Sequence, residues 1–172
     1  MKHLYAFVAL IGIGLSCFAA DSGEKAASAV RDARRLVECM KAFDPVCTAE
    51  LTYTKFLEDK GMPREYMVKS VTDLDTKLKS IGAKYSRFEV IDPVATYSGD
   101  GRDYAFVPYV QVMEAGATRG GLRAFFIGVS LDGGTSWQFV DGVKVTPESI
   151  KAVMPSYAGQ PLPAVGPLEQ LN

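Results

Sequence analysis

The sequence predicts an α+β domain in which N-terminal helices pack on an antiparallel sheet. Apolar residues recur at helical spacing between residues 21 and 81, and the spacing becomes that of extended strands after Gly82. Residues 121–144 have the aromatic-rich pattern of two strands around a tight turn. Because so long a hairpin is stable only within a larger, covered sheet, we expect residues 21–154 to form a single domain.

The first twenty residues have the pattern of a signal peptide. Lys2 supplies a basic start, and the apolar run Leu4–Leu15 is too short to span a membrane. Small residues between Cys17 and Asp21 predict cleavage there. Acylation of Cys17 is the alternative, although the residues before it depart from the usual bacterial lipobox. We therefore expect a periplasmic or secreted protein whose mature chain has no transmembrane segment.

Two helices are predicted next. The first covers Asp21–Ala42, and Asp21 with Glu24 resembles a capping box at its start. The second begins with Asp44 as N-cap and Pro45 in its first turn, and it ends before Gly61. The residues predicted to be buried on this second helix are Val46, Ala49, Tyr53, Phe56 and Leu57.

A third helix begins at Met62-Pro63 and ends at Gly82, which occupies the position of a left-handed C-terminal cap. Its apolar residues recur so regularly that we expect the whole stripe to be buried in the core. The stripe consists of Met67, Val71, Leu74, Leu78 and Ile81.

Cys39 and Cys47 are the two cysteines that survive signal cleavage, and an exported chain meets an oxidising compartment. On one straight helix their Cα atoms would be about 12 Å apart, whereas a disulfide requires less than about 7 Å. The Asp44-Pro45 pair between them predicts a corner that brings them together. We expect a disulfide, with two buried free thiols as the alternative.

Strands are predicted at Tyr85–Val90, Val94–Tyr97 and Tyr104–Met113, with a break at Asp92-Pro93 between the first two. A loop containing three glycines, 114–121, precedes the hairpin strands, which are residues 122–131 and 137–143. The third strand is apolar on both faces, which is unusual when one face meets water. We therefore expect its second face to be covered in a homodimer or to line a cavity.

The turn of the hairpin resembles the Asp-box, the S-x-D-x-G-x-[ST]-W turn that recurs in sialidases. The matching residues are Ser130, Asp132, Gly134, Ser136 and Trp137. In proteins that carry it, the Asp-box is a folding unit on a hairpin and does not perform catalysis. The chain has one such turn and is too short for a propeller, so the resemblance implies a structural turn.

Thr146-Pro147 begins a last short helix that ends near Val153. Four prolines follow in residues 155–172, and they predict an extended tail without regular structure.

Composition excludes several classes of function. His3, the only histidine, lies in the predicted signal peptide, so Ser-His and Cys-His catalysis and nearly all zinc sites are excluded from the mature chain. Its charge is nearly balanced, because the 19 lysines and arginines fall to 18 without Lys2, against 20 aspartates and glutamates. No basic stripe predicts nucleic-acid binding, and no motif predicts a cofactor or a metal.

Three helices followed by a bent antiparallel sheet that ends in a long hairpin resemble the nuclear transport factor 2-like superfamily, which has the cystatin-like fold. The resemblance covers about residues 21–143 and depends on element order. It implies a strongly curved, cone-shaped sheet whose open end holds a small apolar ligand. Members include steroid isomerases, dehydratases and non-enzymatic binding modules, so the resemblance alone does not choose a function.

We expect an exported, non-catalytic module that binds a small apolar or amphipathic molecule, or an envelope protein, in an apolar pocket with no acid at its base. The expected ligand-binding residues are Tyr53, Tyr85, Tyr104, Tyr109 and Arg123. One alternative is an isomerase or lyase that uses one carboxylate and one tyrosine, and Tyr97 is a further candidate for that tyrosine. The candidate carboxylates are Glu89, Asp92 and Asp103, while Arg123 is also a candidate to pair with Glu89 or Asp141. A structural or assembly domain without a ligand is the second alternative.

Overall fold

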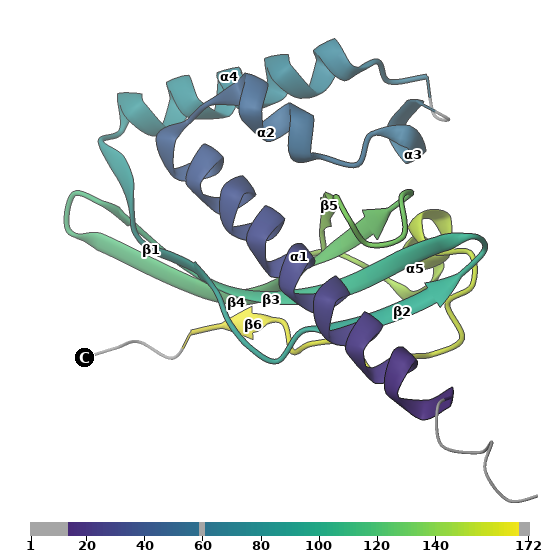
Figure 1. Cartoon of the computed structure of the whole chain (residues 1–172). Helices are drawn as coiled ribbons and strands as arrows, with labels where there is room; N and C mark the ends of the chain where they lie inside the picture. Colours follow the sequence, from purple (N-terminus) through teal and green to yellow (C-terminus); the bar gives the residue numbers. More distant parts are fainter. Residues whose placement is uncertain (1–13, 59–60, 169–172) are drawn as a thin grey trace, which may run out of the picture.

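The computed structural model describes residues 14–58 and 61–168, and the side chains of residues 14–21, 56, 57 and 147 lie outside this description. Within these ranges the α+β class is confirmed, since the helices pack on an antiparallel sheet that does not close (Figure 1). The helices are α1 (Gly14–Ala42), α2 (Pro45–Leu51), α3 (Lys55–Glu58), α4 (Arg64–Ser80) and α5 (Pro147–Val153). The strands are β1 (Ala83–Val90), β2 (Ala95–Gly99), β3 (Arg102–Ala115), β4 (Thr118–Ser130), β5 (Gln138–Asp141) and β6 (Gly166–Pro167).

The two longest strands, β3 and β4, form the centre of the sheet and are antiparallel along almost their whole length. The outer positions are each shared by two shorter strands. β1 and β2 pair with successive parts of β3, and β5 and β6 pair with successive parts of β4. Figure 1 shows β3 and β4 bending along their length, with α1, α2 and α4 on the concave side. The predicted break at Asp92-Pro93 is the point where β1 gives way to β2.

The sheet has a hydrophobic core on each face. On the concave face, α1 contributes Ala29, Ala33, Leu36 and Val37 to a core with alternate residues of β3, β4 and β5. On the other face, Ile150 and Met154 from α5 and its C-terminal end pack on the remaining residues of the same strands. Tyr157 and Leu162 of the tail extend this second core. The two-sided apolar pattern of β3 is therefore explained by one chain that covers both faces, so the pattern no longer indicates a partner subunit.

Two helix boundaries differ from the prediction. α1 begins at Gly14, so Asp21 lies inside the helix and does not cap it; residues 14–20 include leucine and alanines, which favour helix. Residues 1–13 of the predicted signal peptide lie outside the described residues. The predicted second helix is divided, because the Tyr53 backbone N–H donates to the Phe139 carbonyl oxygen at 2.9 Å. This bond draws the chain into contact with β5 between α2 and α3.

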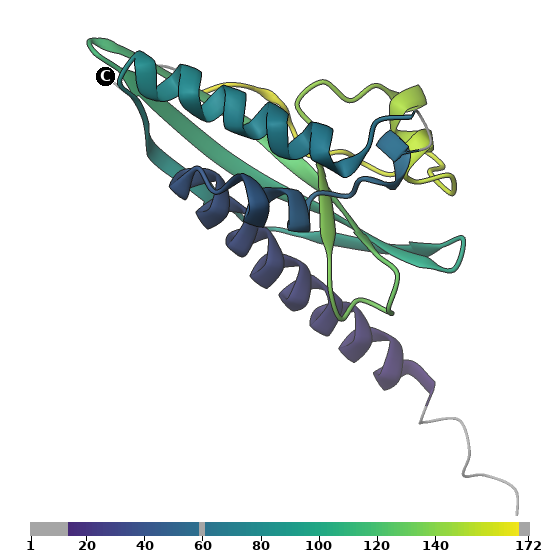
Figure 2. The ribbon, with the colours of Figure 1, turned by 90° about the horizontal axis from the view of Figure 1, so that it is seen from above.

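The predicted stripe on α4 is buried only in part. Leu78 is buried and Met67 and Val71 are half-buried, but Leu74 and Ile81 are 51% and 58% exposed. Figure 2 shows the reason, since α2 lies between α1 and α4 and keeps α4 in an outer position. α4 contacts α2 and β1 and therefore has too few neighbours to bury every apolar residue. The prediction of a fully buried stripe was wrong.

The glycine-containing segment 114–121 is also not a loop. β3 and β4 are joined by a two-residue turn at Gly116, whose φ is +59°, and the strand continues through Gly120 and Gly121. A side chain at Gly121 would approach the Cδ1 atom of Leu168 within 2.9 Å. Glycine here admits the tail, which forms β6 against Leu122 and Arg123. The tail thus includes a short strand, contrary to the prediction of no regular structure.

Candidate functional site

A cavity of about 310 Å³ lies between the helices on the concave face and strands β4 and β5. Its walls are mostly apolar, as expected for a ligand pocket. The lining residues are Leu36, Met40, Thr48, Thr52, Met67, Val71, Phe126, Phe139, Val140 and Asp141. We call this space the helix–sheet pocket. Its outer wall is the half-buried part of α4, which explains why Met67 and Val71 are not packed into the core.

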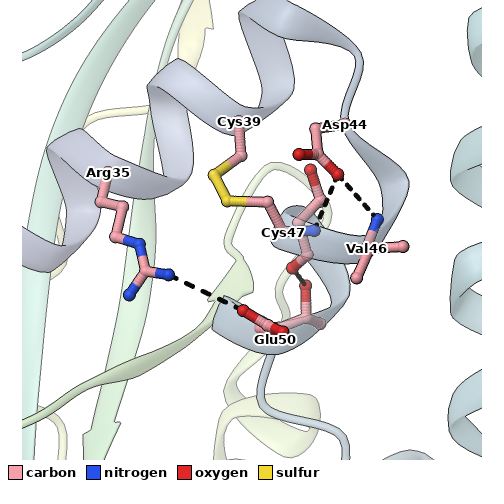
Figure 3. Close-up of a disulfide and its surroundings, with 8 residues drawn as sticks. Arg35, Cys39, Asp44, Val46, Cys47 and Glu50 are labelled. Atoms are coloured by element: carbon pink, nitrogen blue, oxygen red, sulfur yellow. Dashed lines mark hydrogen bonds and ion pairs between the residues drawn. A yellow bond between two sulfur atoms is a disulfide. The ribbon is translucent and has the colours of Figure 1, made fainter.

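The predicted disulfide between Cys39 and Cys47 is confirmed, and it fixes the wall of the pocket formed by α1 and α2 (Figure 3). The two Cα atoms are 5.7 Å apart. The predicted N-cap is present as well, because an Asp44 carboxylate oxygen accepts the backbone N–H groups of Val46 and Cys47 at 3.1 and 2.9 Å. Since pocket residues Met40 and Thr48 directly follow the two cysteines, the bridge holds both of them in place.

Asp141 is the acidic residue among those that line the pocket, and it lies at the rim, whereas the expectation concerned an acid at the base. It lies two residues after Phe139 in β5 and so points to the same face of the sheet, the face on which Trp137, just before the strand, is also buried. Its Oδ1 atom accepts the Tyr109 hydroxyl at 3.1 Å and the Val143 backbone N–H at 3.0 Å.

The surroundings of Asp141 are aromatic. Tyr109 is 1% exposed and stacks on Phe126 with ring centroids 4.4 Å apart. Although Asp141 is exposed at the pocket rim, its Tyr109-facing oxygen lies toward the interior, and the loss of hydration there raises the pKa of the carboxyl group. Burial, and then the nearby Asp141 charge, raise the pKa values of Tyr109 and Tyr85. Within the described residues no cation is paired with Asp141.

A second polar group of the pocket comes from α2. Thr48 is 6% exposed, and its hydroxyl has no hydrogen-bond partner in the described part of the chain. The neighbouring Thr52 hydroxyl donates to the Thr48 carbonyl oxygen at 2.7 Å, so its own donor is already used. A buried hydroxyl without a partner costs folding free energy, and it is therefore a candidate to bond a ligand.

The predicted ligand-binding tyrosines divide between the two faces of the sheet. Tyr85 and Tyr109 are on the concave face, near Asp141. Tyr53 and Tyr104 belong to the second core, with Tyr97 packed against it. The Tyr53 hydroxyl accepts a hydrogen bond from Arg102 Nη1 at 3.1 Å. Side chains alternate along β3, so the odd separation of 104 and 109 places these two tyrosines on opposite faces.

The other predicted polar residues lie outside the pocket. Arg123 is exposed, on the part of β4 that pairs with β6. Glu89 is exposed and accepts Arg87 Nε at 2.8 Å, and Asp92 is exposed. Asp103 is buried and forms an ion pair with Lys25 at 3.0 Å. These contacts make Glu89 and Asp103 parts of ion pairs. The sequence signal that would have identified Asp141 is its spacing, because it continues the alternation of the inward-facing residues Trp137 and Phe139.

The Asp-box-like turn has a structural role. The Asp132 carboxylate accepts the Thr135 and Ser136 backbone N–H groups at 3.1 and 3.0 Å, and the Ser130 and Ser136 hydroxyls at 2.7 and 2.6 Å. These bonds, led by those from Ser136, lower the pKa of Asp132 to about 2. The turn docks on α1, since Trp137 Nε1 donates to the Ser28 hydroxyl at 2.9 Å.

A polar cavity of about 480 Å³ lies beside this turn, between it and α1 and α2. Four of its charged side chains form pairs, Arg31 with Asp32 at 2.8 Å and Arg35 with Glu50 at 3.7 Å, and the fifth, Asp132, accepts four hydrogen bonds from its own turn. The helix–sheet pocket, in contrast, contains a carboxylate oxygen, Asp141 Oδ2, and a Thr48 hydroxyl for which the described residues supply no hydrogen-bond partner. We therefore regard the helix–sheet pocket as the candidate site.

Among the described residues, no group of three or more histidines, cysteines or acids is placed to hold a metal ion. No helix of the described part is sufficiently long and apolar to cross a membrane. Comparisons with protein-family models, with curated proteins and with solved structures find no match for this chain.

Proposed function

We propose that the protein is an exported binding module that holds a small, mostly apolar molecule in the helix–sheet pocket. The observation that carries the proposal is an apolar cavity of about 310 Å³ with two polar groups, the Asp141 carboxylate and the Thr48 hydroxyl, that retain hydrogen-bonding capacity among the described residues. This volume is at the lower end of the range for small-molecule sites. The disulfide supports export, because such bridges persist in oxidising compartments. Helices followed by a bent sheet support the resemblance to nuclear transport factor 2-like proteins.

A pocket-filling variant tests the proposal. N-phenyl-1-naphthylamine, an uncharged fluorescent probe of apolar sites, should bind at one saturable site of the full protein. Val71→Phe places a ring in the pocket and should weaken binding at least about 10-fold, since an overfilled space rejects its ligand. Leu74→Phe is the matched control, because Leu74 lies one turn along α4 and is 51% exposed. No saturable binding, or equal affinities of the two variants, would refute the proposal.

Proton transfer is a second candidate function, and the hydrogen bond between Tyr109 and Asp141 favours it. A carboxylate with a raised pKa is a suitable general base for a proton next to a carbonyl group. If Asp141 has this role, the protein should exchange the α-protons of cyclohexanone for deuterium in deuterated water, and Asp141→Asn should abolish the exchange. No exchange above the buffer rate in NMR spectra would remove this candidate.

The remaining alternatives have less support. An assembly domain without a ligand does not explain the cavity or the unpartnered Thr48 hydroxyl. A homodimer through the sheet stays a prediction, but the face that suggested it is covered by α5 and the tail. Sedimentation at micromolar concentration tests it, and a monomer would leave the binding proposal unaffected.

A further inference from the structure

The polar groups of the helix–sheet pocket restrict the charge of its ligand. Of the two carboxylate oxygens of Asp141, Oδ1 accepts both protein hydrogen bonds, from Tyr109 and Val143. Oδ2 receives no donor from the described residues. A carboxylate has about four acceptor positions, so Asp141 keeps unused capacity where it lines the pocket.

One side of the Asp141 carboxylate faces the interior, yet none of the described residues supplies the paired cation that is usual for a carboxylate that loses hydration. Its neighbours are aromatic, with Tyr109 bonded to it and Phe126 opposite it in the strand pairing. Aromatic faces also attract cations, because their π-electrons carry partial negative charge. A carboxylate among aromatic rings therefore favours a cationic group and repels an anionic one.

We infer that the helix–sheet pocket selects an apolar molecule with a protonated amine, which donates a charge-assisted hydrogen bond to Asp141 Oδ2 while its apolar part contacts Met40, Met67 and Val71. This inference rests on the proposed function and specifies its ligand class. Tyr109 and the Val143 N–H hold the carboxylate in place through Oδ1, so they are positioning groups. Thr48 supplies a second polar contact for ligands that carry a hydroxyl or carbonyl group.

Three molecules with the same aromatic body separate the contribution of charge from that of apolar contact. They are 2-phenylethylamine, 2-phenylethanol and phenylacetate, titrated into the full protein at neutral pH by calorimetry. The amine should bind at least about 10-fold more tightly than the alcohol, because hydrogen bonds between charged groups are the stronger kind. Phenylacetate should bind more weakly than the alcohol, since its charge has the sign of Asp141.

Variants then assign the selectivity to one residue. Asp141→Asn should reduce the amine affinity to about that of the alcohol and change the alcohol affinity less than about 3-fold. Asp73→Asn, an exposed aspartate on α4, is the matched control and should leave all three affinities unchanged. Asp141→Ser provides the same test if the asparagine variant does not fold.

The outcomes distinguish failure of the inference from failure of the proposed function. Equal affinities of amine and alcohol for the natural protein would overturn the amine selectivity and leave apolar binding intact. Amine selectivity that persists in folded Asp141→Asn would equally overturn the assignment to Asp141. If none of the three molecules binds and N-phenyl-1-naphthylamine does not bind either, both the inference and the proposed function are wrong.

Discussion

Asp132 and Asp141 lie in the same hairpin and have opposite surroundings. Asp132, in the turn, accepts four hydrogen bonds from its own turn, and its pKa is lowered to about 2. Asp141, at the end of β5, accepts two, and the loss of hydration on its Tyr109-facing side raises its pKa. The difference shows that an aspartate can have two different roles within one hairpin. A carboxylate saturated by local donors stabilises a turn, whereas one left undersaturated retains capacity for a ligand.

The largest expected effect is on stability, from a substitution beside the Asp132 turn. Trp137 is 2% exposed, and its Nε1 atom connects the turn to Ser28 of α1. Trp137→Ala should lower the free energy of unfolding by about 3–5 kcal/mol, because it leaves a cavity and removes this bond. Urea denaturation followed by circular dichroism measures the loss. A loss below about 1 kcal/mol would contradict a stabilising role of this turn.

Removal of the disulfide should have the second-largest effect, and it should also alter the helix–sheet pocket. The double variant Cys39→Ala/Cys47→Ala should lose about 2–3 kcal/mol of stability, because the closed loop of the unfolded chain is released. Affinity for N-phenyl-1-naphthylamine should fall as well, since Met40 and Thr48 follow the cysteines and line the pocket. Urea denaturation and fluorescence titration measure the two effects. An unchanged affinity would show that the bridge does not hold the pocket wall.

The same substitution at the two aspartates should give different results. Asp132→Asn should cost about 1–2 kcal/mol, because one acceptor oxygen becomes a donor that faces other donors; solvent at this exposed turn limits the loss. Asp141→Asn should change stability by less than about 1 kcal/mol or increase it, since the amide oxygen still accepts from Tyr109 and no charge is desolvated. If denaturation curves showed equal losses of stability for the two variants, the distinction between Asp132 and Asp141 would be wrong.

The smallest effect is a difference in pH dependence. The folded-state pKa of Asp132, about 2, lies below its ordinary value of 3.8, so its stabilisation is complete above pH 4 and is lost between about pH 4 and 2. The folded-state pKa of Asp141 is raised, so its ionisation reduces stability as pH increases from 3.8 through the raised value. The cost of Asp132→Asn should therefore shrink in acid, while any gain from Asp141→Asn should disappear there. Denaturation of both variants and the natural protein from pH 2 to 7 measures how each change in stability depends on pH. If the two changes had the same sign of slope against pH, the opposite pKa shifts of Asp132 and Asp141 would be refuted.

Local signals in the sequence predicted much of the fold. Asp44 and Thr146 cap their helices, Gly82 has the expected positive φ of 65°, and the spacing of Ser130 to Trp137 predicted the turn. Each of these features depends on hydrogen bonds or backbone geometry within a few residues. The pocket was predicted less well, because Asp141 was considered only as a pairing residue for Arg123. Tyr53 and Tyr104 were expected to bind the ligand, but they pack in the second core.

The sequence by itself determined the α+β class, the disulfide corner and the turn, because nearby residues supply the caps, the proline and the donors that form them. Only the tertiary structure decided that α5 and the tail cover the second face of the sheet, and that α4 is held away from the core by α2. It also decided that Thr48 and Asp141, 93 positions apart, line one cavity. Such pairings depend on how whole elements pack, and the spacing of apolar residues does not specify which elements will meet.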